Sequence, residues 1–468
     1  MGDDHRRFEP FVHLVDVTSD AALIGWGGFF HQLVDGRWQV VDDDDLDGPR
    51  RHKGGSIGAT SPTYGPATVE VLDGSGQVVA TTSCDDVNHA VVEGLAPDTE
   101  HTYRVVVDGR AWADGALQGW VVDGDQSGPR PTGRRYDRRF RTHPAPDDDQ
   151  PISLLVWGDY GVGIDQGEDG QRQHGVARTM ERLAATRPVR ALVSLGDNIY
   201  HRPRGATTES GDEDDDWYLT FYEPYRFLID HLPVYAAAGN HDGSDEEASD
   251  DRAQLADNFH LEARFGAGGL RGRHASMEPG LFYRAPIGAL LDLVCIDTTW
   301  GEHEGEHRFD DDEHRAWLEE VLSPRPWTEA ASPWRLPFGH HPAYGAGPHH
   351  EIMWEQVRSL LPLYDQAAVR LLMSGHEHNF QHGRTGTLDH LVSGASAKLE
   401  ERTPTRFAES GTLEWAAAVH CLLVEVHPDR IEVTPYGATG AGEEPQPVPL
   451  LTPGGDPAPS TITITPAP

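Results

Sequence analysis

The sequence predicts a small all-β sandwich followed by a larger α/β domain. Short β-type runs separated by turn signals fill residues 8–145, which is the pattern of a β-sandwich. A linker rich in Pro and acidic residues covers residues 143–151. Beyond it, residues 151–436 alternate apolar strand-like runs with helical patterns, as expected of an α/β sheet. We therefore expect two domains and a remaining tail at residues 437–468.

One segment of the first domain resembles a motif of a known domain family. Residues 94–105 read Gly-Leu-Ala-Pro-Asp-Thr-Glu-His-Thr-Tyr-Arg-Val, which resembles the turn into the sixth strand of fibronectin type III domains. The resemblance implies that Trp26 is the buried tryptophan of the second strand. It also implies that residues 138–142 form the closing strand. His101 stands where this family usually places an aromatic residue.

The second domain shows strand and helix patterns that predict a covered sheet. Residues 173–186 and 314–322 have helical periodicity. Residues 290–296 are nearly all apolar, as in a strand buried on both faces of its sheet. The last segment, residues 437–468, is rich in Gly, Pro and Thr, so we expect it to be a loosely held tail.

Composition argues against several classes of function. The formal net charge of −38 opposes binding to nucleic acid, which requires Lys and Arg to neutralise phosphates, and opposes adhesion to anionic membranes. No apolar run approaches the ~18 residues of a membrane-spanning helix. The N-terminal residues carry no apolar signal core, and the three widely spaced cysteines form no disulfide framework. These features predict a cytoplasmic protein, and they leave its oligomeric state open.

Five short polar motifs, each placed after an apolar run, dominate the second domain. The runs are residues 152–157, 191–195, 233–238, 334–338 and 369–374. In chain order the motifs are Gly158-Asp-Tyr-Gly161, Gly196-Asp-Asn-Ile-Tyr200, Gly239-Asn-His-Asp242, Gly339-His-His-Pro342 and Gly375-His-Glu-His378. In an α/β sheet, functional groups collect at the carboxyl ends of the strands. The motifs are therefore expected to bring Asp, Asn, Tyr and His side chains to one rim.

A rim of this composition predicts a site for a pair of metal ions. Phosphate ester hydrolysis by two metals needs oxygen ligands, imidazoles and a carboxylate that bridges the ions, which lie about 3.5–4 Å apart. Taken alone, Gly-Asp-x-Gly is an ordinary turn, and Tyr200 is a half-buried aromatic residue. Five such motifs in succession, each after an apolar run, are not explained as five independent turns.

In their order and residue identities, the motifs resemble the signature of the purple acid phosphatases within the calcineurin-like metallophosphoesterases. The resemblance covers about residues 152–436 and is closest to the small tartrate-resistant branch. It implies a β-sandwich flanked by helices, in α-β-β-α layers. It also implies one ion held by Asp159, Tyr200 and His378, a second held by Asn240, His340 and His376, and a bridge between them from Asp197.

Tyr200 is the position that distinguishes the purple branch. A phenolate suits Fe(III), and in that family it gives the purple colour. Other metallophosphoesterases lack this Tyr and commonly begin with Asp-x-His, whereas this chain has Gly161 at the third position. The resemblance therefore implies Fe(III) in one site. The divalent ion of the other site stays open between Fe, Zn and Mn, because an N/O donor set discriminates poorly among them.

Two further histidines have catalytic roles by the same resemblance. His241 would contact the phosphate and help to protonate the leaving group, and His349 would be a second acid, nine residues after His340. His350 is adjacent to His349, so the choice between them rests on the resemblance alone. His341 is adjacent to His340, and strand alternation favours His340 as the ligand and His341 as a packing residue.

Other polar residues are interpreted as non-ligands. Glu377, between two expected ligands, is predicted to face solvent or to contact a ligand rather than an ion. Most of the 26 histidines, such as His31, His143 and His390, are predicted to lie at the surface.

The leading hypothesis is a binuclear-metal phosphomonoesterase of the acid phosphatase type, in which a metal-bound hydroxide attacks a small phosphate monoester. The alternative within the superfamily is a phosphodiesterase or nucleotide pyrophosphohydrolase. Tyr200 opposes it only weakly, because metal identity does not fix the ester class. A non-catalytic binding module with a vestigial metal site is the other alternative, and the complete set of expected ligands argues against it. The substrate and the role of the N-terminal sandwich stay open.

Overall fold

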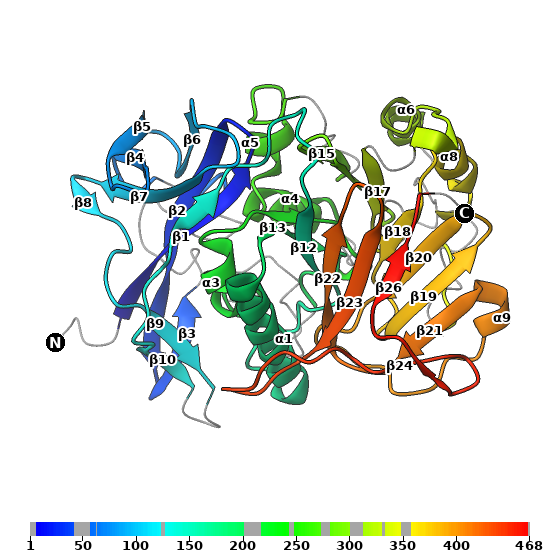
Figure 1. Cartoon of the computed structure of the whole chain (residues 1–468). Helices are drawn as coiled ribbons and strands as arrows, with labels where there is room; N and C mark the ends of the chain where they lie inside the picture. Colours follow the sequence, from blue (N-terminus) through cyan, green and yellow to red (C-terminus); the bar gives the residue numbers. More distant parts are fainter. Residues whose placement is uncertain are drawn as a thin grey trace.

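The N-terminal part of the chain forms two antiparallel β-sheets that pack together, shown in blue and cyan in Figure 1. The computed structural model describes residues 6–41, 57–61, 63–122, 127–200, 217–242, 248–272, 281–299, 312–329, 333–347 and 357–466. One sheet has the order β1-β2-β3 with β6 beside β2, and the other has the order β11-β7-β4-β5 with β8 beside β7. The strands are β1 (Arg6–Val17), β2 (Ala21–Val34), β3 (Arg37–Val41), β4 (Ala67–Leu72), β5 (Val78–Cys84), β6 (His89–Glu93), β7 (Glu100–Val107), β8 (Arg110–Ala111) and β11 (Arg139–Arg141), with a separate hairpin of β9 (Gln118–Val121) and β10 (Gly128–Pro131).

Alternation of apolar residues builds the core of this sandwich. Every second residue of β4 and of β7 is buried, as expected of strands with one face on a core. Trp26 on β2 is fully buried, and β11 closes the sheet beside β7. The His101 ring lies 5.6 Å from the Phe140 ring, so it packs where an aromatic residue was expected. The all-β domain is therefore consistent with a fibronectin type III-like domain.

The second domain contains two larger sheets. The first has the order β14-β13-β12-β22-β23-β26, in which β12, β13 and β14 are parallel. Its strands are β12 (Ile152–Trp157), β13 (Val189–Ser194), β14 (Val234–Ala236), β22 (His420–Val426), β23 (Ile431–Gly437) and β26 (Ile462–Ile464). All six residues of β12 are buried, which agrees with a central strand covered on both faces.

The second of these sheets has the order β15-β16-β17-β18-β20-β19-β21-β24-β25. Its strands are β15 (Tyr283–Ile287), β16 (Leu291–Cys295), β17 (Trp334–Phe338), β18 (Leu371–Ser374), β19 (Phe380–Thr385), β20 (Leu388–Ser393), β21 (Thr412–Ala416), β24 (Leu450–Leu451) and β25 (Pro457–Ala458). Strands β16, β17, β18 and β20 run parallel, so their carboxyl ends lie at the same edge.

Helices cover the outer faces of the two sheets. Figure 1 shows α1 beside β22 and β23, which it contacts, and α6 and α8 near β17 and β18 of the second sheet. Leu318 of α6 and Leu363 of α8 share an apolar cluster with Val294 and Leu372 of that sheet. The expected α-β-β-α layers are therefore confirmed. The helices are α1 (Gly167–Thr186), α3 (Glu223–Ile229), α4 (Ala248–Asn258), α5 (Leu261–Phe265), α6 (Asp312–Val321), α8 (Leu361–Gln366) and α9 (Phe407–Ser410), with shorter helical turns at Tyr218–Tyr222, Asn240–Asp242 and Trp327–Glu329.

The segment expected to be a loosely held tail is part of the sheets, so that expectation is wrong. Strand β26 pairs antiparallel with β23, and Ile462 and Ile464 on it are buried. Strand β24 pairs with β21. Ile and Thr alternate over residues 461–465, which is a strand pattern. The Gly- and Pro-rich composition around this short run obscured it.

A buried interface joins the two domains. The Arg226 guanidinium of α3 lies 2.6 Å from the Glu9 carboxylate of β1, and the Phe11 ring lies 6.0 Å from the rings of Tyr218 and Tyr222. On the same strand, Asp16 pairs with Arg271 at 2.7 Å. Apolar residues of both domains belong to one continuous core. The sandwich and the α/β domain therefore pack as one structural unit.

The surface positions predicted for three histidines are wrong, because His31, His143 and His390 are all buried. The three cysteines are free, in agreement with the sequence. Among the described residues, no helix is both long enough and apolar enough to cross a membrane.

Candidate metal centre

The five motifs follow the carboxyl ends of five strands, three in one sheet and two in the other. Asp159 follows β12, Asp197 follows β13 and Asn240 follows β14. From the second sheet, His340 follows β17 and His376 follows β18. The strand ends of both sheets thus supply side chains to a single site.

The first group of candidate ligands consists of Asp159, Asp197 and His378. Their ligand atoms all lie within 4.8 Å of one another. The Tyr200 hydroxyl lies 3.3 Å from Oδ1 of Asp159 and 3.3 Å from Nε2 of His378. Two carboxylates, an imidazole and a phenol therefore converge on one point.

The second group contains His340, His341 and His376, whose ring nitrogens also lie within 4.8 Å of one another. Oδ1 of Asn240 lies 2.9 Å from Nε2 of His340 and 3.1 Å from Nδ1 of His376. Oδ1 of Asp197 lies 3.4 Å from Nε2 of His340. Asp197 therefore touches both groups, as a bridging carboxylate would.

Backbone contacts fix how His340 presents its ring. Nδ1 of His340 lies 2.9 Å from the carbonyl oxygen of Leu195, so this nitrogen carries the proton and donates it. Nε2, the other ring nitrogen, is then left with a lone pair on the side of Asn240 and Asp197. An outer hydrogen bond of this kind sets the tautomer of a metal-binding histidine.

Three candidate ligands have left-handed backbone conformations, with φ of 55° for Asp159, 52° for Asp197 and 70° for His376. Non-glycine residues rarely adopt this conformation, and it concentrates at functional sites. The turn at His376 points its backbone N–H at the Asp159 carboxylate, 2.9 Å away. A Cβ at Gly239 would overlap the backbone of Asp197, so the third motif requires glycine there.

Asp242 holds the second and third motifs together. Its Oδ1 accepts hydrogen bonds from the backbone N–H groups of Asn198 (2.8 Å) and Ile199 (3.0 Å). Its Oδ2 accepts from the Asn198 side chain (2.8 Å) and from the Gly239 N–H (2.7 Å). This role of Asp242, the last residue of its motif, was not predicted from the sequence.

Burial and neighbouring charges compete across the centre. Burial alone would raise the pKa of Asp197, but the charges of His340 and His241 outweigh it and lower that pKa. Burial would lower the pKa of His340, but Asp197 and Asp159 raise it. The pKa of Tyr200 is raised well above its usual value, first by burial and then by the same two carboxylates. These directions favour an ionised Asp197 and a protonated Tyr200 when no cation is bound.

His341 and Glu377 lie in positions that differ from those predicted from the sequence. The His341 ring lies 4.5 Å from the His376 ring, inside the second group. Strand alternation does not apply to it, because β17 already ends at Phe338. Glu377 is fully buried, so a solvent-facing position is wrong.

Of the two expected acid catalysts, only His241 lies within the described residues. Its backbone N–H donates to Oδ1 of Asp197 at 3.0 Å, and its ring lies 4.6 Å from the Tyr200 ring. His241 is half-buried at the edge of the centre. His349 and the neighbouring His350 lie outside the described residues.

The donor set fits a pair of metal ions. Carboxylate, amide and phenol oxygens with imidazole nitrogens suit Fe, Zn and Mn alike. Asp159, Asp197 and His340 are buried, whereas Asn240 and His376 are half-buried. The site therefore has a buried floor and a side that solvent reaches.

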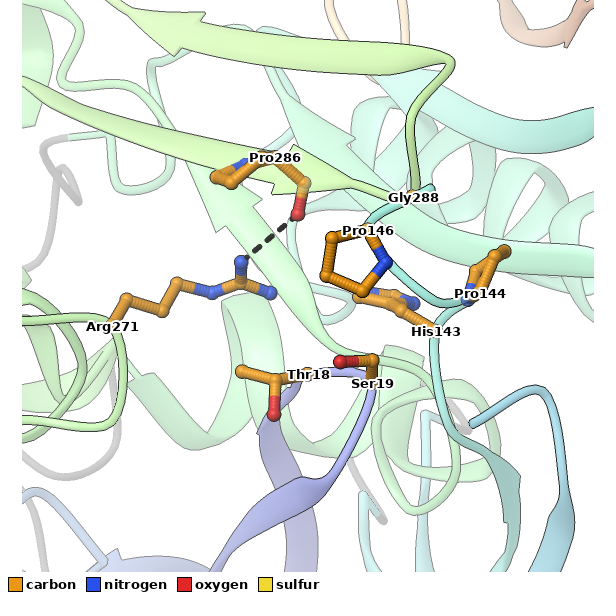
Figure 2. Close-up of a pocket in the computed structure, with 8 residues that line it drawn as sticks. All are labelled: Thr18, Ser19, His143, Pro144, Pro146, Arg271, Pro286 and Gly288. Atoms are coloured by element: carbon orange, nitrogen blue, oxygen red, sulfur yellow. Dashed lines mark hydrogen bonds between the residues drawn. The ribbon is translucent and has the colours of Figure 1, made fainter. Parts of the chain in front are cut away.

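A cavity of about 210 Å³ lies elsewhere, at the junction between the two domains. Figure 2 shows Arg271 and the rings of His143 and Pro146 lining it. The Arg271 guanidinium is paired with Asp16 and also donates to the Pro286 carbonyl oxygen, 3.2 Å away. Burial and the charge of Arg271 lower the pKa of His143 to about 3. A neutral imidazole and a paired guanidinium do not make a metal site, so the motif rim remains the candidate centre.

The comparisons with known proteins cover the part of the chain that carries the motifs. Residues 152–380 match the family model of the calcineurin-like phosphoesterases. Over 262 residues, the chain is 27% identical to purple acid phosphatase 4 of Arabidopsis thaliana, which covers 54% of this chain and 70% of that protein. Purple acid phosphatase 3 of the same plant is 26% identical over 273 residues, covering 56% of this chain and 67% of that protein.

Two solved structures share the fold along nearly the whole chain. The structure of PhoD superposes with a TM-score of 0.61 at 11% identity and covers 99% of this chain and 94% of that one. The purple acid phosphatase PPD1 of yellow lupin (Lupinus luteus) gives a TM-score of 0.57 at 13% identity, covering 98% of this chain and 74% of that one. At these identities the matches show the fold alone, and they include the N-terminal sandwich.

Proposed function

Because this chain carries a calcineurin-like metallophosphoesterase domain and is a homologue of the purple acid phosphatases, we propose that it is a binuclear-metal phosphomonoesterase of the acid phosphatase type. The family match supports hydrolysis of phosphoric esters. What we propose beyond it is the class of ester and the identity of the metal ions. The observation that carries it is the pair of ligand groups joined by Asp197.

The ligand assignment follows the two groups. Asp159, Tyr200 and His378 would hold one ion. Asn240, His340 and His376 would hold the other, with Asp197 bridging. Two bound ions would supply an activated water and neutralise the charge on the phosphoryl group.

The proposal of iron rests on Tyr200. Its phenol has a raised pKa because it is buried beside two carboxylates, so a weakly acidic divalent ion competes poorly with its proton. Fe(III) is a stronger Lewis acid, which makes the Tyr200 site its natural position. The second site, with one amide oxygen and imidazoles, would hold a divalent ion.

The residues around the ions have separate tasks in this proposal. The Asp197 carboxylate and the Asn240 amide would hold the second ion beside His340. His241 lies on the side of the site that solvent reaches, where its imidazole can donate a proton to the departing alkoxide. His341 adds a further imidazole beside His376. The second acid, at His349 or His350, stays a prediction.

Metal analysis combined with an ester screen tests the function. The purified protein should contain two ions per chain and should hydrolyse p-nitrophenyl phosphate faster than bis-p-nitrophenyl phosphate. A clear preference for the bis-ester would favour the phosphodiesterase alternative instead. Protein that stays inactive after reconstitution with iron and zinc would favour a binding module.

A further inference from the structure

Lys398 lies on a loop that is fastened to the metal centre on both sides. The loop follows β20 at the carboxyl edge of its sheet. Before the lysine, the backbone N–H of Ser396 donates to the carbonyl oxygen of Gly158, in the first motif, at 3.2 Å. After it, the backbone N–H of Glu400 donates to the carbonyl oxygen of His378 at 2.8 Å. The position of Lys398 is therefore set by two of the motifs.

The Lys398 ammonium lies over the ring of a candidate ligand. Its Nζ is 4.7 Å from the centre of the Tyr200 ring, within the range of a cation–π contact. The lysine is half-buried, so solvent screens its charge only in part. A positive charge is thus held over the ring whose hydroxyl oxygen would bind iron.

Lysine is rare in this chain, and the charge of Lys398 is not neutralised by its own loop. The sequence has only two lysines, Lys53 and Lys398, and a net charge of −38. Glu400 pairs with Arg402 at 2.5 Å, and Glu401 lies 3.9 Å from Arg172. Among the described residues, no carboxylate forms an ion pair with Lys398, which leaves its ammonium available to an anion.

We propose that Lys398 binds a non-bridging phosphoryl oxygen of the substrate and makes the centre select phosphate monoesters over diesters. The proposal rests on the proposed function and names a residue that would set its preference among phosphate esters. Above pH ~6 a monoester carries two negative charges, whereas a diester keeps one. An additional cation at the edge of the site therefore attracts the monoester more strongly.

Lys398→Met tests the charge while keeping the unbranched stem that covers the Tyr200 ring. Lys398→Arg keeps the charge. Arg139→Gln is the matched control, because it removes one positive charge from an exposed side chain of the N-terminal sandwich. The probe is inorganic phosphate, titrated calorimetrically at pH 7 into the metal-loaded proteins, and the metal content of each protein is measured in parallel.

Phosphate affinity should fall about tenfold or more in Lys398→Met, the loss expected of a hydrogen bond to a charged group. It should stay within about threefold of the original in Lys398→Arg and Arg139→Gln, with unchanged metal content in all three. For p-nitrophenyl phosphate, KM should rise about tenfold with kcat changed less than about threefold, and KM for the bis-ester should change less.

Equal phosphate affinity in the original protein and Lys398→Met overturns the assignment of Lys398, whatever the activity. Loss of metal from Lys398→Met also overturns it, since the lysine would then support the centre rather than the substrate. The binding measurement needs no turnover, so it stays separate from the test of the proposed function. A protein that binds phosphate through Lys398 but hydrolyses no ester would refute only the proposed function.

Discussion

At the scale of single residues, the centre depends on turns whose backbone has a left-handed conformation that few non-glycine residues adopt. Asp159, Asp197 and His376 all have positive φ, and each carries a candidate ligand atom. The ligand residue types were predictable, because their motifs are local in sequence. The role of His341 was not, because the end of β17 decides which way its ring points. The hydrogen bonds of Asp242 also depend on two motifs meeting.

Replacing the bridging carboxylate should dismantle the centre. Asp197→Asn removes the charge that touches both ligand groups, so metal content should fall below two ions per chain and activity should fall about 10³-fold or more. Elemental analysis and p-nitrophenyl phosphate hydrolysis measure both effects. Asp429→Asn, which changes an exposed surface ion pair, should alter neither. An Asp197→Asn protein that keeps two ions and full activity would contradict the bridging role.

Tyr200→Phe should separate the metal identity from the reaction. Loss of the phenol should abolish the visible absorption band of a tyrosinate–iron pair, which an absorption spectrum of the iron-loaded protein detects. Tyr160→Phe is the matched control, since the Tyr160 hydroxyl bonds Asn198 (2.9 Å) rather than a ligand group and the band should persist. An active but colourless original protein would refute the iron assignment and leave the phosphatase proposal standing.

At the scale of elements, the strands before the motifs were predictable because a run of mostly apolar residues leaves a strong local signal. Strand β12 illustrates this, since it is buried along its whole length. The short strands β24, β25 and β26 were missed. They have two or three residues each, and their stability comes from pairing with distant strands rather than from their own composition. The strand propensity of a short segment cannot predict such pairing.

Strand β26 should contribute measurably to stability. Ile464 is fully buried, so Ile464→Ala should lower the free energy of unfolding by about 2–5 kcal/mol, through lost burial and the cavity left behind. Urea unfolding monitored by tryptophan fluorescence measures this. Thr463 on the same strand is exposed, and Thr463→Ala should change the free energy by less than about 0.5 kcal/mol. Equal effects of the two changes would mean that β26 is not packed beside β23.

At the scale of the whole molecule, the two domains share charged groups that are buried where they meet. Arg226 bonds a carboxylate 217 residues away, and Asp16 pairs with Arg271 across the same junction. The sequence predicted two domains and a linker, but not this contact, because nothing local in either segment identifies its partner. Removing one member of such a pair leaves an uncompensated buried charge, which typically costs about 3–5 kcal/mol.

Buried histidines at the same junction should make the protein less stable in acid. Burial, the charge of Arg264 and that of His89 lower the pKa of His13 to about 3, whereas an unfolded chain has a histidine pKa near 6.5. Between these values only the unfolded state binds the proton, so the free energy of unfolding falls as pH decreases from about 6.5 towards 3, by up to about 1.4 kcal/mol per pH unit for each such histidine.

Urea unfolding of the original protein and of His13→Gln at pH 7, 6 and 5 checks this dependence. His13→Gln should reduce the slope of stability against pH by about one proton below pH 6. An unchanged slope would show that His13 does not titrate in this range.

The pairing of β12 with β22 has a consequence for the order in which this protein assembles. Val156 of β12 sits opposite Leu422 of β22, and every candidate ligand, from Asp159 to His378, lies between them in the chain. Closing this pair encircles the entire ligand set in one long loop, and contacts so distant in sequence form slowly. We therefore predict that the ions bind after the first sheet has closed. Chelators present during refolding should then delay recovery of activity without delaying formation of the β-sheet.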